Sequence, residues 1–289
     1  MSASASTSVQ AARKAVADRL REIRQDAGIS GQALAARAGW YKSKVSRLEN
    51  AVTPASAEDI RAWCRACGAD SETGDLIAAT RSADNMYVEW RRVQRSGLRQ
   101  LQESYLPLYE RTRVFRTYCA NVVPGVLQTH AYATALMRSI SEFHETPDDV
   151  AGAVEARLAR SARVVRQGDH RFALVLEESV LRHRVGDTET MAGQLGHLLS
   201  AMAFPSVSLG VIPFAAERRM WMIETFTVYD EEQAEAELLT ARVNVTTPTE
   251  VRQYLKAFTE FAKLAVHGAD ARALITSAID ALDQSAQDS

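Results

Sequence analysis

The sequence predicts a mainly α-helical protein with a smaller β component (α+β), in which an N-terminal all-α helix-turn-helix bundle precedes a mixed α/β domain with a small sheet. Three observations predict this class. Apolar residues recur at helical spacing between glycines in the first 68 positions. Strand-like and helix-like runs alternate after residue 170. The chain of 289 residues, 46% hydrophobic and 24% charged, has the composition of a globular protein and the length of two domains.

The first two helices follow from apolar spacing and glycine stops. Apolar residues recur at steps of four, three and four from Val16 to Ala27, which is the repeat of one helix face. Gly28 ends that helix. Ser30 is placed to cap a second, short helix over residues 31–38.

A third helix is predicted over residues 42–49, with Val45 and Leu48 buried. At 100° per residue, its other face carries lysine, arginine and serine and no acidic side chain. Such donors suit phosphates and guanine edges in a major groove that admits one α-helix. A packing module with a solvated basic face is the alternative. The residues expected to contact DNA are Lys42, Ser43, Lys44, Ser46 and Arg47.

A fourth helix over residues 57–67 repeats apolar residues at i, i+3, i+4 and i+7 and closes the bundle. Cys64 and Cys67 complete this apolar stripe, so we expect them in the core, with a thiol sensor as the alternative. No second Cys/His pair follows to supply the four ligands of a structural zinc site, and no metal is expected.

The run LREIRQDAGISGQALAARAGWYKSKVSRLEN, within residues 16–68, resembles the Xre-type helix-turn-helix of phage repressors. The resemblance implies that Gln32 contacts the DNA backbone at the start of the second helix. The sequence departs from the family at Ala51, where a glycine is common, so we expect Asn50 to take the left-handed conformation instead. The residues that the resemblance places near bases or phosphates are Lys42, Ser43, Lys44 and Arg47.

The expected segments are a disordered leader (1–12), the helix-turn-helix domain (13–68), a helical linker (69–97) and the mixed α/β domain (98–284). The linker contains a predicted helix over about 76–94. Its basic cluster is interpreted as a solvated face, with DNA contact or an interdomain salt-bridge surface as alternatives. The cluster consists of Arg91, Arg92, Arg95 and Arg99.

The larger domain alternates helices and strands. A strand, a helix and a strand between residues 171 and 213 imply a right-handed crossover joining parallel strands. The acidic turn DEEQAEAE would join the last two strands as a hairpin. The predicted helices are 125–140, 148–167, 187–203, 248–266 and 271–282, and the predicted strands are 171–176, 207–213, 225–229 and 238–245.

Residues 98–284 resemble the domain of unknown function that follows the helix-turn-helix in a large group of actinomycete regulators. The segments that carry the resemblance are VVPGVLQTHAYATALM, EARLAR, VLEESVLRHRVGD, QLGHLL and VSLGVIPF. The resemblance implies a regulator of development or antibiotic production, often encoded beside a small partner protein.

A group of polar residues follows the strand 171–176, at a strand end where α/β folds often place ligands. Helix capping and salt bridges explain these residues about as well as a ligand or partner site does. The group consists of Glu177, Glu178, Arg182, His183 and Arg184.

Charge divides unevenly along the chain. Residues 1–68 hold eleven Lys/Arg and six Asp/Glu, a net charge of +5, which leaves −7 for residues 69–289. The cationic part favours DNA, and the acidic part is repelled by it. No secretory signal, long apolar run or disulfide framework is evident, so we expect a cytoplasmic, nucleoid-associated protein without membrane contact.

These patterns predict a sequence-specific DNA-binding transcription regulator, acting as a homodimer on double-stranded DNA. Its larger domain would serve dimerisation and the sensing of a small-molecule effector or a small companion protein. The alternative is an antitoxin-like or scaffold protein whose larger domain binds that companion. An enzyme is not expected, because the sequence lacks a nucleophile, phosphate-loop or dinucleotide motif, and no cofactor is expected.

Overall fold

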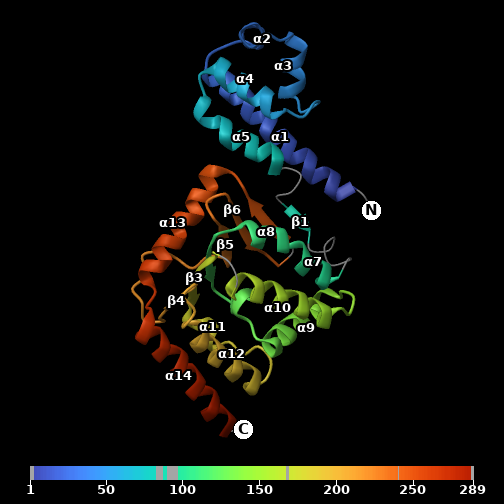
Figure 1. The fold of residues 1–289 in the computed structure, drawn as a ribbon. Coiled ribbons are helices and arrows are strands. Elements are labelled where there is room, and N and C mark those ends of the chain that lie inside the picture. The colour runs from blue at the N-terminus through green and yellow to red at the C-terminus, as the bar shows by residue number, and fades with distance from the viewer. Residues whose placement is uncertain (1–2, 83–86, 90–96, 167–168, 240, 288–289) are drawn as a thin grey trace. The chain divides into compact units, whose positions relative to one another are not determined.

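The computed structural model describes residues 3–82, 87–89, 97–166, 169–239 and 241–287. It divides into two compact units, the first formed by residues 1–87 with 244–252 and the second by residues 88–243 with 253–289. Figure 1 labels the elements of both units along the chain. Among the described helices, none combines the length and the apolar character needed to cross a bilayer.

The first unit is a helical bundle. Helices α2 (Gly31–Ala38), α3 (Lys42–Glu49) and α4 (Ala57–Cys67) have the predicted bounds. Helix α1 (Ala3–Asp26) begins upstream of the predicted start and includes residues 3–12, where the sequence suggested a disordered leader. The alanines of this segment favour a helix and let α1 continue upstream. A 3-10 turn η1 (Asp70–Glu72) and helix α5 (Thr73–Ser82) complete the bundle.

The bundle core lies between the apolar stripes of these helices. Leu20, Leu34 and Ile60 are almost fully buried around Trp63, whose indole N–H donates to the backbone carbonyl of Leu20 at 2.9 Å. A buried indole needs such an acceptor, because an unpaired N–H in the core costs free energy. The hydrogen bond therefore fixes the position of α4 against α1.

Local capping explains where the helices begin and end. The Ser30 hydroxyl accepts from the backbone N–H of Ala33, and Gly39 ends α2 in the left-handed conformation at φ 69°. Ser56 and Asp59 form a reciprocal capping box at the start of α4. These side chains satisfy backbone donors that a helix terminus leaves without a partner.

The second unit is built on a mixed sheet with strand order β1-β7-β6-β5-β2-β3-β4. Strand β2 pairs in parallel with β3 and antiparallel with β5, while β3 and β4 are parallel, as predicted. The strands are β1 (Tyr87–Glu89), β2 (Val114–Cys119), β3 (Arg171–Glu177), β4 (Val207–Ile212), β5 (Phe226–Tyr229), β6 (Gln233–Glu237) and β7 (Ala241–Val245).

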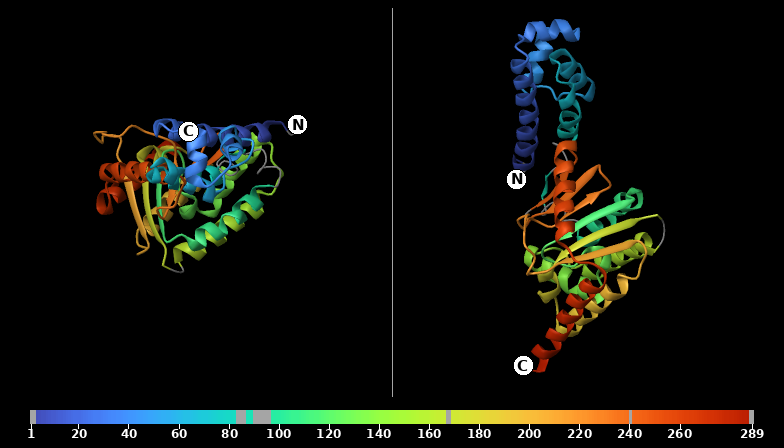
Figure 2. Two further views of the ribbon diagram at one scale, coloured as in Figure 1. Left: turned by 90° about the horizontal axis from the view of Figure 1, so that it is seen from above. Right: turned by 90° about the vertical axis from the view of Figure 1, so that its left-hand side faces the viewer.

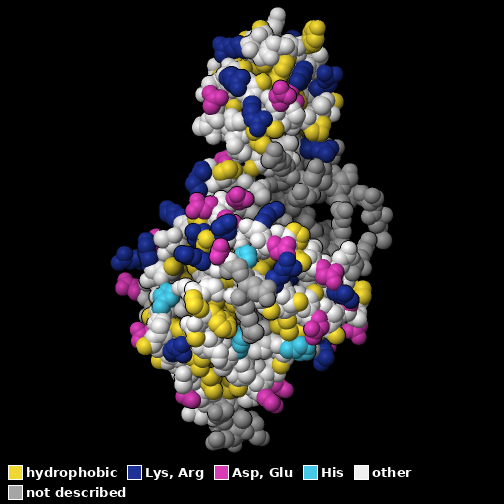
Figure 3. Space-filling model, in the orientation of Figure 1, with side chains coloured by type: hydrophobic (Ala, Val, Ile, Leu, Met, Phe, Trp, Pro, Cys, Tyr) yellow, Lys and Arg dark blue, Asp and Glu magenta, His cyan; other side chains and the backbone are white. Residues whose placement is uncertain are grey.

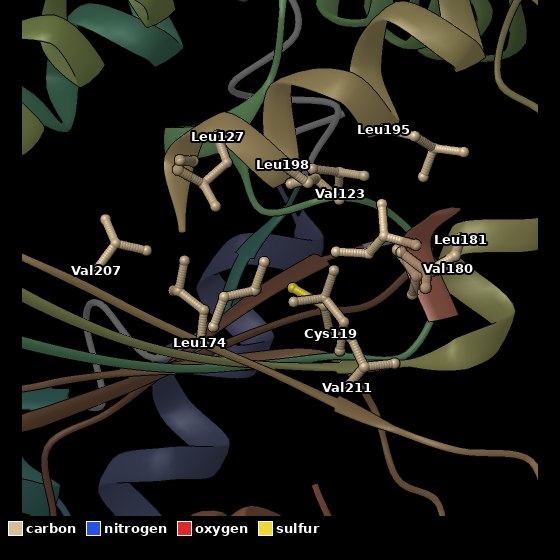
Figure 4. Close-up of a cluster of buried hydrophobic side chains, with 14 of the residues drawn as sticks. Cys119, Val123, Leu127, Leu174, Val180, Leu181, Leu195, Leu198, Val207 and Val211 are labelled. Atoms are coloured by element: carbon tan, nitrogen blue, oxygen red, sulfur yellow. The ribbon is translucent and has the colours of Figure 1, made fainter. Parts of the chain in front are cut away.

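Helices cover both faces of this sheet. The face that carries Phe115 and Cys119 packs with apolar residues of α9, α12 and α14, and Figure 4 shows part of this core. The opposite face carries Tyr118, whose ring stacks on Phe261 of α13 at 3.9 Å; Figure 2 shows α13 over the strands. The helices are α7 (Leu98–Ser104), α8 (Leu106–Arg111), η2 (Gly125–Leu127), α9 (His130–His144), α10 (Val150–Arg166), α11 (Glu178–Arg182), α12 (Thr188–Ala201), α13 (Pro248–Leu264) and α14 (Gly268–Gln287).

The hairpin differs from the predicted one. The acidic segment expected as a turn contains β6, which pairs antiparallel with β5. The turn is confined to the start of this segment, at Asp230, whose φ is 53° and whose carboxylate accepts the backbone N–H groups of Arg113 and Val114. The predicted strand over 238–245 begins at Ala241 in the structure.

The linker differs as well. The helix predicted over 76–94 ends at Ser82 as α5, and residues 87–89 form β1, so the single long helix is wrong. The β-branched and aromatic composition of Tyr87-Val88 suits a strand once a sheet edge is available. Arg91, Arg92 and Arg95 of the basic cluster lie outside the described residues, while Arg99 pairs with Glu103 at 2.8 Å within α7.

Candidate DNA interface

Helix α3 has an exposed side that carries cations and a buried apolar side. Val45 and Leu48 are each 2% exposed and anchor the helix in the bundle core. The predicted contact residues on its other side, Lys42, Ser43, Ser46 and Arg47, are exposed, and Figure 3 shows Lys and Arg side chains on the visible face of this unit. Across the part of the chain that the structure describes, the side chains of Lys42 and Arg47 make no hydrogen bond or ion pair with protein groups. These two cations are available to an external polyanion.

The C-terminal end of α3 is held by arginines of α1. Arg24 donates to the Glu49 carboxylate at 2.5 Å and to the backbone carbonyl of Ile29 at 2.8 Å. Arg21 donates to the backbone carbonyl of Glu49 at 2.7 Å. Cations suit a helix C-terminus, where carbonyl groups lack partners and the helix dipole is negative. The two arginines therefore set the orientation of α3 on the bundle.

Lys44 differs from its neighbours on α3. Its ammonium group forms an ion pair with Asp59 at 2.5 Å and lies 4.3 Å from the centre of the Trp40 ring. Burial opposes ionisation of Asp59, but hydrogen bonds from Lys44 and Ser56 outweigh it and lower the pKa of the carboxyl. The structure thus gives Lys44 a role in joining α3 to α4, beside its predicted role in DNA contact.

The chain turns after α3 at a residue other than the one expected. Ala51 has a φ of 54°, whereas Asn50 has a φ of −101°, so the expectation of a left-handed Asn50 is wrong. The Asn50 side chain instead donates to the carbonyl of Ser46 at 2.7 Å and accepts from Arg21. These bonds keep Asn50 at a negative φ. The left-handed conformation that turns the chain after α3 is therefore adopted by Ala51, where a Cβ atom makes it strained.

Two further residues border the basic face. Gln32, at the start of α2, is exposed as the phosphate-contact prediction requires. Tyr41 is 85% exposed immediately before α3, while the neighbouring Trp40 packs near Trp63 with ring centres 6.3 Å apart. Exposure distinguishes the two aromatic residues that precede α3, because Tyr41 is open to solvent while Trp40 packs toward the core.

The cysteine pair lies in the bundle rather than at a reactive surface. Cys64 is buried, and burial raises the pKa values of both thiols, that of Cys67 to about 11. A thiol with a raised pKa holds little thiolate at neutral pH, which favours the packing interpretation over a thiol sensor. Within the described ranges, no group of three or more His, Cys, Asp or Glu residues could hold a metal ion.

The polar group after β3 is engaged with the protein itself. Glu177 is 2% exposed and accepts hydrogen bonds from Tyr118 and Arg218. Arg182 donates to the carbonyl of Ser277 at 3.2 Å and pairs with Glu178. Of the other two predicted residues, His183 and Arg184 are exposed, and Arg184 donates to Thr188 at 3.3 Å. These bonds agree with the salt-bridge alternative, and a ligand role for the group stays a prediction.

Two family models match the chain. Residues 15–77 match a helix-turn-helix domain, which covers α2, α3 and α4. Residues 102–277 match a domain of unknown function (DUF5753), which covers most of the second unit. No curated protein and no solved structure matches the chain.

Proposed function

The chain belongs to the DUF5753 family and carries an N-terminal helix-turn-helix domain, and from this premise we propose that it is a sequence-specific transcription regulator of the Xre type. A helix-turn-helix domain indicates DNA binding. In this proposal α3 enters the major groove, Arg47 reads a base edge and Lys42, Ser43 and Ser46 contact bases or phosphates. Gln32 binds the backbone, and the larger domain serves dimerisation and sensing.

The observation that carries the proposal is the free charge of α3. Lys42 and Arg47 are exposed and lack protein partners across the described ranges, whereas Lys44 of α3 is paired with Asp59, and Arg24 of α1 is paired with Glu49 of α3. Exposed guanidinium groups bind phosphates and guanine edges through charge-assisted hydrogen bonds. The inner pairs hold the helix, and the outer cations are left for DNA.

Selection of binding sites from random duplexes, followed by titration of the selected site, tests this proposal. We expect Arg47→Ala to weaken binding to the selected site by about 1 to 3 kcal/mol and to change binding to unrelated DNA less. Arg61→Ala removes the same charge from an exposed position on α4 and should retain sequence preference. An equal loss on both DNAs for Arg47→Ala would mean a phosphate contact, and failure to enrich any site would reject sequence-specific binding.

Dimerisation is the second part of the proposal. One helix-turn-helix unit reads too few base pairs to define a unique site, and a dimer would place two recognition helices about 34 Å apart in successive major grooves. Sedimentation of the full chain, alone and with the selected duplex, measures its stoichiometry. A monomer when the chain is alone, together with a single protomer on each full site, would reject the dimer.

A companion protein is the alternative role for the larger domain, and one surface favours it. The loop between β4 and β5 exposes Phe214, Trp221 and Met222, at 64%, 72% and 52% of their surface. Glu178 accepts the backbone N–H of Phe214 at 2.9 Å, which holds one end of the loop. Contiguous exposed apolar patches mark interaction surfaces, and this loop carries three large exposed apolar side chains. Pull-down from native cells with the wild-type chain and with Trp221→Ser would detect a companion that depends on the loop.

A further inference from the structure

The second unit contains a cavity of about 290 Å³ on the face of the sheet that carries Phe115. Helices α7 and α10 line it on one side and strands β2, β5 and β6 on the other. Its wall includes the aromatic residues Tyr105, Tyr109, Phe115 and Tyr229. The volume is near the lower end of that of small-molecule sites, and the wall combines these aromatic rings with polar and charged side chains.

Two arginines of α10 contribute the charge of this cavity. Arg160 is 6% exposed, donates to the carbonyl of Gln102 at 2.5 Å and lies 4.6 Å from the centre of the Tyr109 ring. Arg157 donates to the side-chain oxygens of Gln102 at 3.1 Å and Gln128 at 2.5 Å. Both guanidinium groups thus bind neutral oxygens of the protein.

Neither arginine has an acidic partner at short range. In the described residues, no carboxylate oxygen lies within 4 Å of a nitrogen of Arg157 or Arg160, and Nε of Arg160 is buried without a hydrogen-bond partner. Burial and the neighbouring Arg160 lower the pKa of Arg157. A buried guanidinium that is not neutralised is costly, and an arginine keeps its proton in proteins. The pair therefore favours an external anion.

The acidic residues near the cavity are engaged or exposed. Glu235 accepts from the Tyr105 hydroxyl at 2.8 Å and lies 3.7 Å from Nε of Arg242. Glu237 lines the cavity but is exposed, and it acts on Arg157 through space. Arg242 is the nearest cation to Glu235, and Arg160 acts on Glu235 through space, so the two arginines of α10 have carboxylates near them but none in contact.

We propose that this cavity binds a small aromatic organic anion, whose acidic group pairs with Arg157 and Arg160 and whose ring packs against Tyr109 and Phe115. A guanidinium fork matches a carboxylate in two parallel hydrogen bonds, and the unpartnered Nε of Arg160 supplies one donor. The assignment deepens the proposed sensing role of the larger domain and rests on it. Its test measures ligand binding alone, so it fails or succeeds independently of DNA binding.

The test compares acids with their neutral amides on the full chain. Benzoate, phenylacetate and 1-naphthoate are titrated by calorimetry beside benzamide, phenylacetamide and 1-naphthamide. We expect at least one acid to bind about tenfold or more tightly than its amide, because only the acid pairs with the arginines. Equal affinities within every pair, or no saturable binding of any acid below about 10 mM, would overturn the proposal.

Variants locate the site. Arg157→Gln should weaken the bound acid by about tenfold and leave its amide unchanged. Arg163→Gln removes the same charge from α10 at an exposed position paired with Glu110 and should bind like the wild type. Thr227→Phe adds bulk at the cavity wall, leaves both arginines in place and should abolish binding of the acid. This second variant keeps the site testable if Arg157→Gln does not fold. An equal loss in Arg163→Gln, or wild-type binding in a folded Thr227→Phe, would place the anion elsewhere.

Discussion

Arginine has opposite surroundings in helix α3 and in the cavity of the larger unit. Arg47 on α3 is exposed and lacks a protein partner among the described residues, whereas Arg160 is 6% exposed and binds Gln102. An exposed guanidinium is solvated and can meet a polyanion at little cost, but a buried one needs groups that replace water. The comparison teaches that burial, rather than the number of arginines, decides whether a cation stays open to solvent or is engaged by groups of the protein.

The largest expected effect comes from a third arginine, which stands between these extremes. Arg218 forms an ion pair with the buried carboxylate of Glu177. The Tyr118 hydroxyl donates to the same carboxylate at 2.8 Å. Arg218→Ala would leave that carboxylate without its counter-charge, and we expect a loss of about 3 to 4 kcal/mol in the free energy of unfolding. Urea unfolding followed by circular dichroism measures it. Arg219→Ala, an exposed neighbour, should change stability by less than about 0.5 kcal/mol; similar losses in both would contradict the role of burial.

Glu235 shows the effect of burial on an acidic residue. Burial raises its pKa from 4.5 to about 7, although Arg242 opposes the shift. A folded-state pKa above the unfolded one means that the folded chain binds more protons between these values, so stability falls as the pH rises from about 4.5 to 7. The loss approaches about 3 kcal/mol, since each pKa unit corresponds to 1.36 kcal/mol. Urea titrations at pH 5 and pH 8 should show this loss in the wild type and not in Glu235→Gln; the same pH dependence in both chains would assign it to other groups.

The cavity also shows what periodicity alone does not reveal. Arg160 is buried on the apolar stripe of α10, between Val154 and Val164, and the half-buried Arg157 lies about one turn before it. A cation at an apolar position of an amphipathic helix is a signal of a charged interior site, and it is visible in the sequence. The partners that make the site, Gln102, Gln128 and Glu235, come from distant segments, so their meeting depends on the tertiary fold.

Local patterns predicted the bundle better than the sheet. Helices α2, α3 and α4 follow from apolar spacing and caps within single segments. Strand β2 was not predicted, because a central strand covered on both faces does not alternate between polar and apolar residues. Its Thr117 pairs with Thr227 across the sheet at 3.1 Å. Strand β6 was taken for a turn, since Glu235 looks solvent-exposed until its buried partners are known.

In the first unit, we expect the next largest loss of stability when Arg24, which pairs with Glu49, is replaced. Its side chain is 15% exposed and binds Glu49, which is 12% exposed. Arg24→Ala should reduce the free energy of unfolding by about 2 kcal/mol, because it leaves the partly buried Glu49 carboxylate without its closest charge-assisted bonds. Thermal unfolding of Arg24→Ala beside Arg61→Ala measures the difference. Equal midpoints would show that α3 is held by its apolar face alone.

The smallest effect concerns the turn that follows α3. Ala51 adopts a φ of 54°, where a Cβ atom is strained and glycine is not, although glycine loses more backbone entropy on folding. We expect Ala51→Gly to stabilise the chain by about 0.5 to 1 kcal/mol, since strain relief exceeds the entropy term. Ala36→Gly, at an exposed helical position of α2, should destabilise it by about 1 kcal/mol. Opposite shifts of the thermal midpoint would establish that the strain at Ala51 is real, whereas a loss in both variants would show that Ala51 fits its conformation without cost.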